Sequence, residues 1–342
     1  MGARAVGVIA NPVSGKDIRR LVANAPTSTL QEKYTIVRRV VIGAVEAGVE
    51  RFFFLPEPHN ICARAVETLH LEFEWSHLEL PARYDESDTV RAAAALRELG
   101  CGAVAVLGGD GTNRAVALGW RDAPVMAIST GTNNVFPSFL EATVAGAAAG
   151  LVAAGSVSLE EAARPSKVID VEIEGERPDL ALIDAVLVAE RFVGSRALFD
   201  PTALRVAMMT RAEPASVGIA SIGGLLAPCS AEDDHGVCVR FAPLTGDEDE
   251  AEAGGSTRLR APLAPGLYAE VGIAAADRVA FGAPVTVAGP GILAFDGERH
   301  RVLQPGQSAT LRITRSGPRV IDAAKVMGLA ADRALFTERG RQ

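Results

Sequence analysis

The first half of the chain alternates short apolar runs with longer amphipathic segments, and this alternation limits the possible folds more than any other feature. Four runs bounded by Gly, Pro or Asn have the length and content of buried strands: 5–10, 51–55, 103–107 and 124–128. Apolar residues recur with helical spacing at 17–25, 33–47, 60–70 and 88–99, the last with Asp88 as a candidate N-cap. Alternating strands and helices predict an open, mostly parallel sheet with helices on both faces.

The pattern changes after about residue 165, where helical periodicity fades. Short β-like segments separated by Gly- and Pro-rich turns follow at 167–173, 180–189, 236–242, 278–288 and 308–314. A length of 342 residues suits two domains. We therefore predict an α/β nucleotide-binding domain at 1–160, a β-rich, sandwich-like substrate domain at 161–315, and a C-terminal segment at 316–342 that can return to the first domain. The acidic stretch 245–257 is expected to be a surface loop.

Composition narrows the classes of function. The longest apolar run, 142–155, is rich in Ala and Gly and shorter than the roughly 20 strongly apolar residues that a membrane helix needs. The N-terminus has no signal-peptide pattern, so we expect a cytoplasmic protein. A net charge of −8 argues against a nucleic-acid partner, and no basic amphipathic segment points to a membrane surface.

Cysteine and histidine spacing predicts no metal site. The four cysteines form neither a C-x-x-C pair nor a cluster at zinc spacing, and they are expected to be small buried hydrophobes: Cys62, Cys101, Cys229 and Cys238. The five histidines, among them His59 and His235, are scattered along the chain without the spacing of metal ligands.

Three turns rich in Gly and Asn follow three of the predicted strands. They are "NPVSGK" (11–16), "GGDGTN" (108–113) and "STGTNN" (129–134), and they carry hydroxyls at Ser14, Thr112, Thr130 and Thr132. Glycine lets backbone N–H groups approach a phosphate, and the N-terminus of a following helix adds partial positive charge. Because ligands gather beyond the carboxyl ends of parallel strands, the three turns predict one shared polyphosphate site. Neither the Walker A spacing nor G-x-G-x-x-G is present.

Two charged residues in or beside the second turn each allow two interpretations. Asp110 would repel phosphate, so its presence needs a reason. One interpretation is functional: the carboxylate binds Mg²⁺ or accepts a proton from an attacking hydroxyl. The other is structural: the carboxylate forms an Asx-turn with neighbouring amides. Arg114 either pairs with an anionic group of a substrate or is a solvated helix residue. The residue pattern alone leaves both choices open.

Several motifs resemble one known superfamily, which unites NAD kinases with diacylglycerol and sphingoid-base kinases. "GGDGT" at 108–112 is similar to its signature, "NPVSGK" to the NP-x-S-G element of the lipid-kinase branch, and "STGTNNVFP" at 129–137 to P-x-G-T-x-N-D-F. "FDGE" at 295–298 resembles the D-G-E element, and "ALIDAV" at 181–186 lies where NAD kinases carry A-L-N-[DE]. "IANPVSGKDIRRLV" and "IGGLL" (222–226) resemble the ATP-NAD kinase-like group called acetoin catabolism protein X.

The resemblance implies a two-domain, NAD kinase-like enzyme with its active site in the cleft between an α/β domain and a β-sandwich-like domain. It assigns ATP, Mg²⁺ and NAD as ligands, and it suggests a homodimer or homotetramer. Its candidate catalytic residues are Asp110, Asp296 and Glu298, with Mg²⁺ near Asp110 or Asp296. The residues implied to bind nucleotide are Asn11, Ser14, Gly15, Lys16, Gly108, Gly109, Gly111, Thr112, Asn113, Thr130, Gly131, Thr132, Asn133, Asn134 and Asp184.

The chain departs from both branches at several motif positions. Arg114 and Ala115 replace the Asn and Glu that follow the signature in lipid kinases, and Val135 replaces their aspartate. Ile183 replaces the asparagine of the NAD kinase Asn-Asp/Glu pair. The resemblance therefore favours an ATP-dependent phosphotransferase acting on a hydroxyl of a small polar metabolite, with NAD as the leading acceptor. A lipid kinase of the diacylglycerol type and a non-catalytic, nucleotide-binding regulatory protein are the alternatives.

Overall fold

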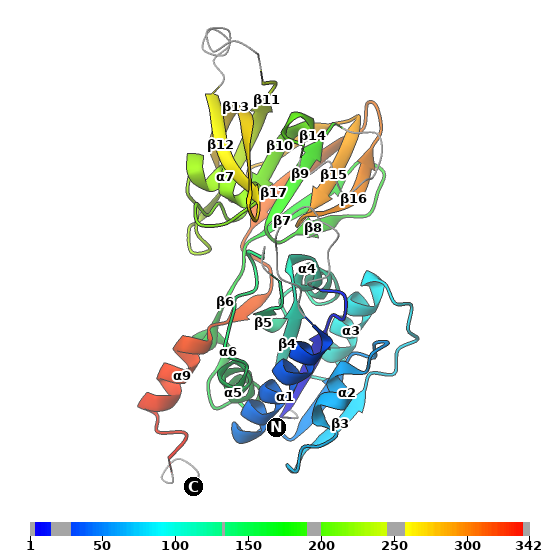
Figure 1. Cartoon of the computed structure of the whole chain (residues 1–342), viewed down its shortest axis with the longest axis vertical. Helices are drawn as coiled ribbons and strands as arrows, with labels where there is room; N and C mark the ends of the chain where they lie inside the picture. The colour runs from blue at the N-terminus through cyan, green and yellow to red at the C-terminus, as the bar shows by residue number, and fades with distance from the viewer. Residues whose placement is uncertain (1–3, 15–28, 132–133, 190–199, 245–256, 338–342) are drawn as a thin grey trace. The chain divides into compact units, whose positions relative to one another are not determined.

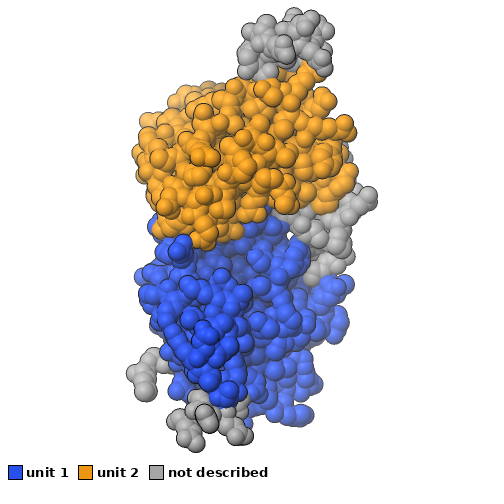
Figure 2. Space-filling view, turned by 90° about the vertical axis from the view of Figure 1, so that its left-hand side faces the viewer, with its two compact units in different colours: residues 1–16, 27–166, 316–342 blue, residues 17–26, 167–315 orange. Residues whose placement is uncertain are grey.

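The chain forms two compact units, which Figure 2 colours separately. Unit 1 comprises residues 1–16, 27–166 and 316–342, and unit 2 comprises 17–26 and 167–315. The computed structural model describes residues 4–14, 29–131, 134–189, 200–244 and 257–337, with only the backbone at Arg299 and His300. The predicted helix 17–25 and residues 245–256 of the acidic stretch lie outside the described residues.

Unit 1 is built on the predicted sheet, with strand order β3-β2-β1-β4-β5-β18-β6. The four predicted strands are confirmed, and pairing is parallel throughout except between β18 and β6. The strands are β1 (Ala5–Ala10), β2 (Arg51–Phe54), β3 (Glu74–His77), β4 (Ala103–Gly108), β5 (Pro124–Ser129), β6 (Ala163–Pro165) and β18 (Arg319–Ile321). Strand β18 returns from the far end of the sequence to pair with β5.

Helices cover both faces of this sheet, as the alternation predicts (Figure 1). Val6, Val8 and Ala10 of β1 join a core cluster with the buried residues of α1 and α5, whereas Gly7 faces Leu96 of α3. The helices of unit 1 are α1 (Leu30–Glu46), α2 (Ile61–Val66), α3 (Glu86–Glu98), α4 (Asp110–Gly119), α5 (Ala142–Ala153), α6 (Leu159–Ala162) and α9 (Ala323–Asp332). β1 therefore lies between two helical layers and is fully buried.

One predicted helix start is wrong. Asp85, not Asp88, is the N-cap of α3, and its side chain accepts the amide of Ser87 at 2.9 Å. Asp88 lies inside the helix, where its carboxylate accepts the amides of Arg83 and Tyr84 from the preceding segment. Two aspartates three residues apart can each serve as a cap, and only Asp85 has the extended backbone that an N-cap requires.

Glycines let α1 and α5 approach closely. A Cβ on Gly43 of α1 would collide with the carbonyl oxygen of Thr143 in α5, and a Cβ on Gly146 would collide with the carbonyl oxygen of Val40. The backbones of the two helices are thus in direct contact. This contact explains why the Ala- and Gly-rich run 142–155 forms a buried helix, for its small side chains leave room for α1.

Replacing Gly43 with alanine is expected to lower the free energy of unfolding by about 1–3 kcal/mol, because a helix must shift to admit the methyl group. Gly328 in α9 is a matched control, since a Cβ there meets no described heavy atom within 4 Å. Gly328→Ala should raise stability by roughly 1 kcal/mol through helix propensity. Urea unfolding measures both, and similar effects of the two substitutions would contradict the steric explanation.

Unit 2 is a sandwich of two antiparallel sheets, ordered β12-β13-β11-β10-β9-β15-β16 and β14-β17-β7-β8. Its strands are β7 (Val168–Ile173), β8 (Asp179–Ala181), β9 (Asp184–Val188), β10 (Leu204–Met209), β11 (His235–Ala242), β12 (Thr257–Ala264), β13 (Leu267–Ala280), β14 (Val285–Ala288), β15 (Gly291–Phe295), β16 (Glu298–Leu303) and β17 (Ser308–Thr314). Side chains from both sheets, such as Val171, Leu311 and Phe295, form one core between them. The helix α7 (Ile219–Leu226) packs on the other face of the larger sheet.

Two predicted strands of unit 2 are each divided in the structure. The segment 180–189 forms the end of β8 and all of β9, because the amides of Leu182 and Ile183 bind a carboxylate in place of a neighbouring strand. The segment 278–288 is divided by a turn in which Gly282 has φ of +78°. The β-like pattern of apolar residues continues across both interruptions, so it does not reveal where one strand ends and the next begins.

The four cysteines are free and buried, as predicted. Burial raises the pKa of the Cys101 thiol to about 12, and it also raises the pKa of Cys62. Among the described helices, none is both long and apolar enough to cross a membrane.

Candidate functional site: three turns at one sheet edge

The strand order of unit 1 brings the three predicted turns to one edge of the sheet. β1 pairs with β2 on one side and β4 on the other, and β4 pairs with β5. From β1 the chain adds β2 and β3 on one side and then crosses to the other side of β1 to add β4 and β5, so the position between β1 and β4 is a topological switch point. Ala10 pairs with Leu107, and Gly108 pairs with Ser129, which places the carboxyl ends of the three strands side by side. Open α/β sheets bind ligands at such a point.

Side chains of the first turn connect it to the other two. Asn11 donates from Nδ2 to the hydroxyl of Thr112 at 2.9 Å, and its Oδ1 accepts the amides of Val13 and Ser14. The Ser14 and Thr130 hydroxyl oxygens are 2.8 Å apart. The linked residues are 101 and 116 positions apart in the sequence. The three turns are therefore one hydrogen-bonded assembly, in which residues of "NPVS", "GGDGT" and "STG" have fixed relative positions.

Lys33 of α1 binds the backbone of the first turn. It was not among the site residues predicted from the sequence. Its side chain is fully buried, and Nζ donates to the carbonyl oxygens of Asn11 (2.8 Å), Pro12 (3.0 Å) and Ser14 (2.7 Å). These three hydrogen bonds to one buried ammonium fix the backbone conformation of residues 11–14. A signal was present, because Lys33 lies four residues before Val37 on the apolar face of the helix, where a charged residue needs a partner.

The second turn leads directly into α4 and needs glycine to do so. Gly109 is the N-cap, and its carbonyl oxygen accepts both the backbone and the side-chain N–H of Asn113. A Cβ on Gly109 would lie 2.8 Å from Oδ1 of Asn134 in the third turn. Glycine supplies no side chain that could cap the helix. The backbone amides at the start of α4, and the partial positive charge of its N-terminus, therefore face this sheet edge.

Asp110 joins the second turn to the segment after the third. Its carboxylate accepts the amide of Phe136 at 2.8 Å and that of Val135 at 3.1 Å. The predicted Asx-turn with neighbouring amides is therefore wrong, since the amides belong to residues 25 and 26 positions away. A carboxylate offers about four lone-pair directions, so a carboxylate that accepts two amides can also coordinate a metal ion or accept a proton from a hydroxyl.

The structure contradicts one of the two interpretations of Arg114. It is 1% exposed, and its Nη1 donates to Oε1 of Glu86 in α3 at 2.8 Å. The solvated helix residue is thereby excluded, and one N–H group of the guanidinium serves an ion pair within the fold. Burying a charge requires such a partner.

The remaining predicted residues of unit 1 lie as follows. Ser129 is hydrogen-bonded to Gly131 and to Asn134, which fixes the described part of the third turn. Gly111 is in the first turn of α4. Gly15, Lys16, Thr132 and Asn133 lie outside the described residues.

The three predicted residues of unit 2 lie around the hairpin that joins β15 and β16. Asp296 and Gly297 both have positive φ, as a two-residue hairpin turn requires. The buried carboxylate of Asp296 accepts the amides of Leu182 (2.9 Å), Ile183 (2.7 Å) and Asp184 (3.2 Å). Glu298 is exposed at the start of β16. Asp296 therefore holds the segment between β8 and β9 in place, a role that its motif does not reveal.

Two family models match successive parts of the chain. Residues 6–157 match the ATP-NAD kinase N-terminal domain, and residues 167–316 match the acetoin catabolism protein X C-terminal domain. The acetoin catabolism protein X of Cupriavidus necator is 36% identical over 336 residues, which cover 94% of this chain and 91% of that protein.

Solved structures resemble the fold at low sequence identity. Yeast NADH kinase complexed with NADH matches 99% of this chain and 89% of its own, with a TM-score of 0.55 and 11% identity. A putative diacylglycerol kinase from Bacillus anthracis str. Sterne covers 94% of this chain and 98% of its own, with a TM-score of 0.49 and 12% identity. The NADH kinase match shows that the NAD kinase-like fold predicted from the sequence is correct.

Proposed function

The chain belongs to the acetoin catabolism protein X family, and we propose that it is an ATP-dependent kinase that phosphorylates a hydroxyl of a small polar metabolite, with NAD as the leading acceptor. The observation that carries this proposal is the convergence of three turns at the switch point beside the N-terminus of α4. Backbone amides and hydroxyls gathered there suit the oxygens of a polyphosphate. The match of residues 6–157 to the ATP-NAD kinase N-terminal domain supports the same ligand.

In the proposed reaction, the turns hold the ATP phosphates while the γ-phosphoryl group moves to the acceptor. The bond between the γ-phosphorus and the β–γ bridging oxygen breaks, and a bond to the acceptor oxygen forms. Thr112, Ser14 and Thr130 orient phosphate oxygens through their hydroxyls, and the α4 amides stabilise negative charge. In this proposal Asp110 accepts the proton that the acceptor hydroxyl loses, or it supplies an oxygen ligand to Mg²⁺.

Mg²⁺ fits the residues present at this edge. The ion needs only one or two carboxylates when phosphates complete its coordination, and Asp110 provides one at the start of α4. Bound there, Mg²⁺ would neutralise part of the negative charge of the phosphates. Asp296 fits less well, because its carboxylate already accepts three backbone amides.

A second candidate function is nucleotide binding without turnover, and one observation favours it. Both aspartates with a proposed catalytic role are engaged by backbone amides, Asp110 by two and Asp296 by three. In a regulatory protein that binds nucleotide without turnover, these amide contacts of the two aspartates would serve stability alone. Binding would then stabilise the fold by mass action with no product.

The test is phosphoryl transfer from γ-labelled ATP in the presence of Mg²⁺ with NAD, NADH or diacylglycerol vesicles as acceptor. We expect label in NADP from wild-type protein and a lower rate from Asp110→Asn. Asp322→Asn changes an exposed N-cap aspartate of α9 and is the matched control for a folded protein with one carboxylate fewer.

The three outcomes separate the candidates. Label in NADP or NADPH supports the kinase proposal, whereas label in lipid alone moves the acceptor to an amphiphile. A rise in melting temperature with ATP and no labelled product from any acceptor supports the binding protein and contradicts turnover on these acceptors.

A further inference from the structure

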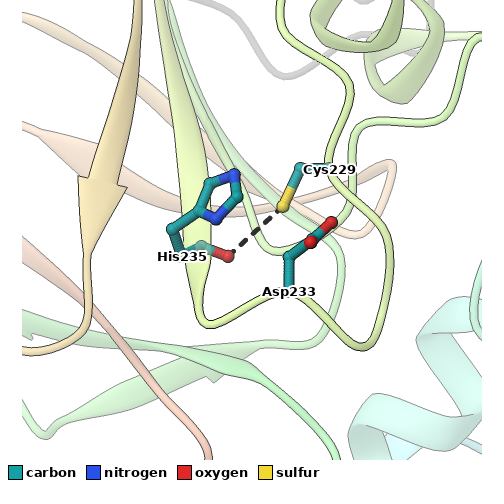
Figure 3. Close-up of side chains that lie close together, drawn as sticks. All are labelled: Cys229, Asp233 and His235. Atoms are coloured by element: carbon teal, nitrogen blue, oxygen red, sulfur yellow. Dashed lines mark hydrogen bonds between the residues drawn. The ribbon is translucent and has the colours of Figure 1, made fainter.

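A loop of unit 2 brings together three side chains that can bind a metal. It runs from Cys229, which pairs with Ala212 in an isolated bridge, to His235 at the start of β11. The Sγ atom of Cys229, a carboxylate oxygen of Asp233 and a ring nitrogen of His235 all lie within 4.8 Å of one another. Figure 3 shows the sulfur between the imidazole and the carboxylate. The spacing C-x-x-x-D-x-H differs from a C-x-x-C pair and from the spacings of known zinc ligands, so the sequence did not predict this cluster.

Each donor is held by the local backbone. Cys229 exchanges two backbone hydrogen bonds with Ala212, at 2.8 and 2.9 Å. Asp233 closes the turn, because its Oδ2 accepts the amide and the hydroxyl of Ser230. His235 pairs with Ala280 of β13, and its Nε2 is buried without a hydrogen bond to any described residue. A buried polar atom of this kind requires a partner.

Two cations, Lys167 and Arg315, fix the loop backbone through its carbonyl oxygens. Lys167 is 3% exposed, and its Nζ donates to the carbonyl oxygens of Ser230 (2.7 Å) and His235 (2.8 Å) and to Sγ of Cys229 (3.3 Å). Arg315 donates from Nη1 to the carbonyl oxygen of Ala231 and from Nη2 to that of Asp233. The loop therefore has its conformation before any ion arrives, which lowers the cost of binding.

Lys167 is compatible with a metal bound to the same sulfur. Two of its three N–H groups donate to backbone carbonyl oxygens and the third donates to Sγ. A thiolate has more than one lone pair, so it can accept this N–H and still bind an ion. Hydrogen bonds to a metal-bound thiolate are a known means of tuning such sites. Burial raises the pKa of the Cys229 thiol, so an ion must displace the proton to solvent as it binds.

We propose that Cys229, Asp233 and His235 bind one thiophilic divalent cation of the Zn²⁺ class, with a fourth position for water. Thiolate and imidazole ligands select Zn²⁺, Co²⁺ and similar ions over Mg²⁺ and Ca²⁺, which prefer oxygen. Ligand atoms around tetrahedral zinc lie about 3.5 Å apart, so the donors need to close by only about 1 Å. The ion joins both ends of the loop and stabilises it. This site is independent of the proposed kinase function.

The test uses Co²⁺ as a spectroscopic probe of the purified, chelator-treated full chain. Wild-type protein is expected to bind one equivalent with a thiolate-to-cobalt charge-transfer band that Zn²⁺ displaces. Cys229→Ser should lose the band, and His235→Gln and Asp233→Asn should each weaken affinity by about tenfold or more, since even outer partners of metal ligands have effects of that size. Cys101→Ser removes another buried thiol and should keep the band.

Folding is followed by circular dichroism, because Cys229 is buried and its replacement can destabilise unit 2. His235 and Asp233 are only half-buried, so their variants keep the test decisive if Cys229→Ser does not fold. A wild-type protein without saturable Co²⁺ binding would overturn the proposal. So would a band that survives in Cys229→Ser, or an affinity unchanged in both His235→Gln and Asp233→Asn.

Discussion

Replacing Lys33 with methionine is expected to weaken ATP binding by at least about tenfold and to lower the free energy of unfolding by about 2–4 kcal/mol. The methionine fills similar space but leaves the carbonyl oxygens of Asn11, Pro12 and Ser14 without their donor. Each hydrogen bond from a charged group contributes about 1.5–3 kcal/mol, and removal of a buried charge offsets part of that loss. The first turn would then lose the conformation that places Ser14 against Thr130.

Calorimetric titration with ATP and urea unfolding measure the two effects. Lys325→Met is the matched control, because Lys325 is exposed on α9 and its replacement should change neither quantity measurably. An unchanged ATP affinity in Lys33→Met would mean that the first turn does not contribute to the nucleotide site, whatever the effect on stability.

Asp296→Ala is expected to lower the free energy of unfolding by about 3–5 kcal/mol, since it removes the acceptor of three buried amides at once. It also leaves an alanine at φ of +50°, where a residue without a polar side chain is strained. Asp296→Asn tolerates that backbone and keeps one acceptor oxygen, so it should lose about half as much.

Glu298→Gln separates the structural role of Asp296 from a shared catalytic role of the D-G-E motif. Glu298 is exposed two residues away, and its substitution should change stability by no more than about 0.5 kcal/mol. Denaturant unfolding of the three variants and the wild type measures the difference. Equal stability of Asp296→Ala and Glu298→Gln would contradict the structural role.

The sequence predicted what depends on local pattern. Short apolar runs located the four strands of unit 1, and the Gly- and Asn-rich turns followed from their positions at strand ends. The order of β1, β4 and β5 then brings these turns together. The sandwich-like second unit was predicted in the same way from β-like segments and turn residues.

Long-range partners could not be predicted, because no local pattern encodes them. For Asp110 the sequence left a functional role and an Asx-turn both open, and neither interpretation named its partners Val135 and Phe136. Asp296 was assigned through its motif, and its hold on residues 182–184 depends on the pairing of β15 with β9. Lys33 carried a signal in its place on an apolar helix face, although its three acceptors became visible only in the structure.

The central claim is that three turns of unit 1 form one site for a polyphosphate. Calorimetric titration of the wild-type protein with ATP and Mg²⁺, alone and in the presence of inorganic triphosphate, tests it most directly. We predict one ATP per chain, competition by triphosphate, and affinity that falls from ATP to ADP to AMP, because the turns contact phosphates rather than the base. Absence of saturable ATP binding, or equal affinity for ATP and adenosine, would contradict the claim.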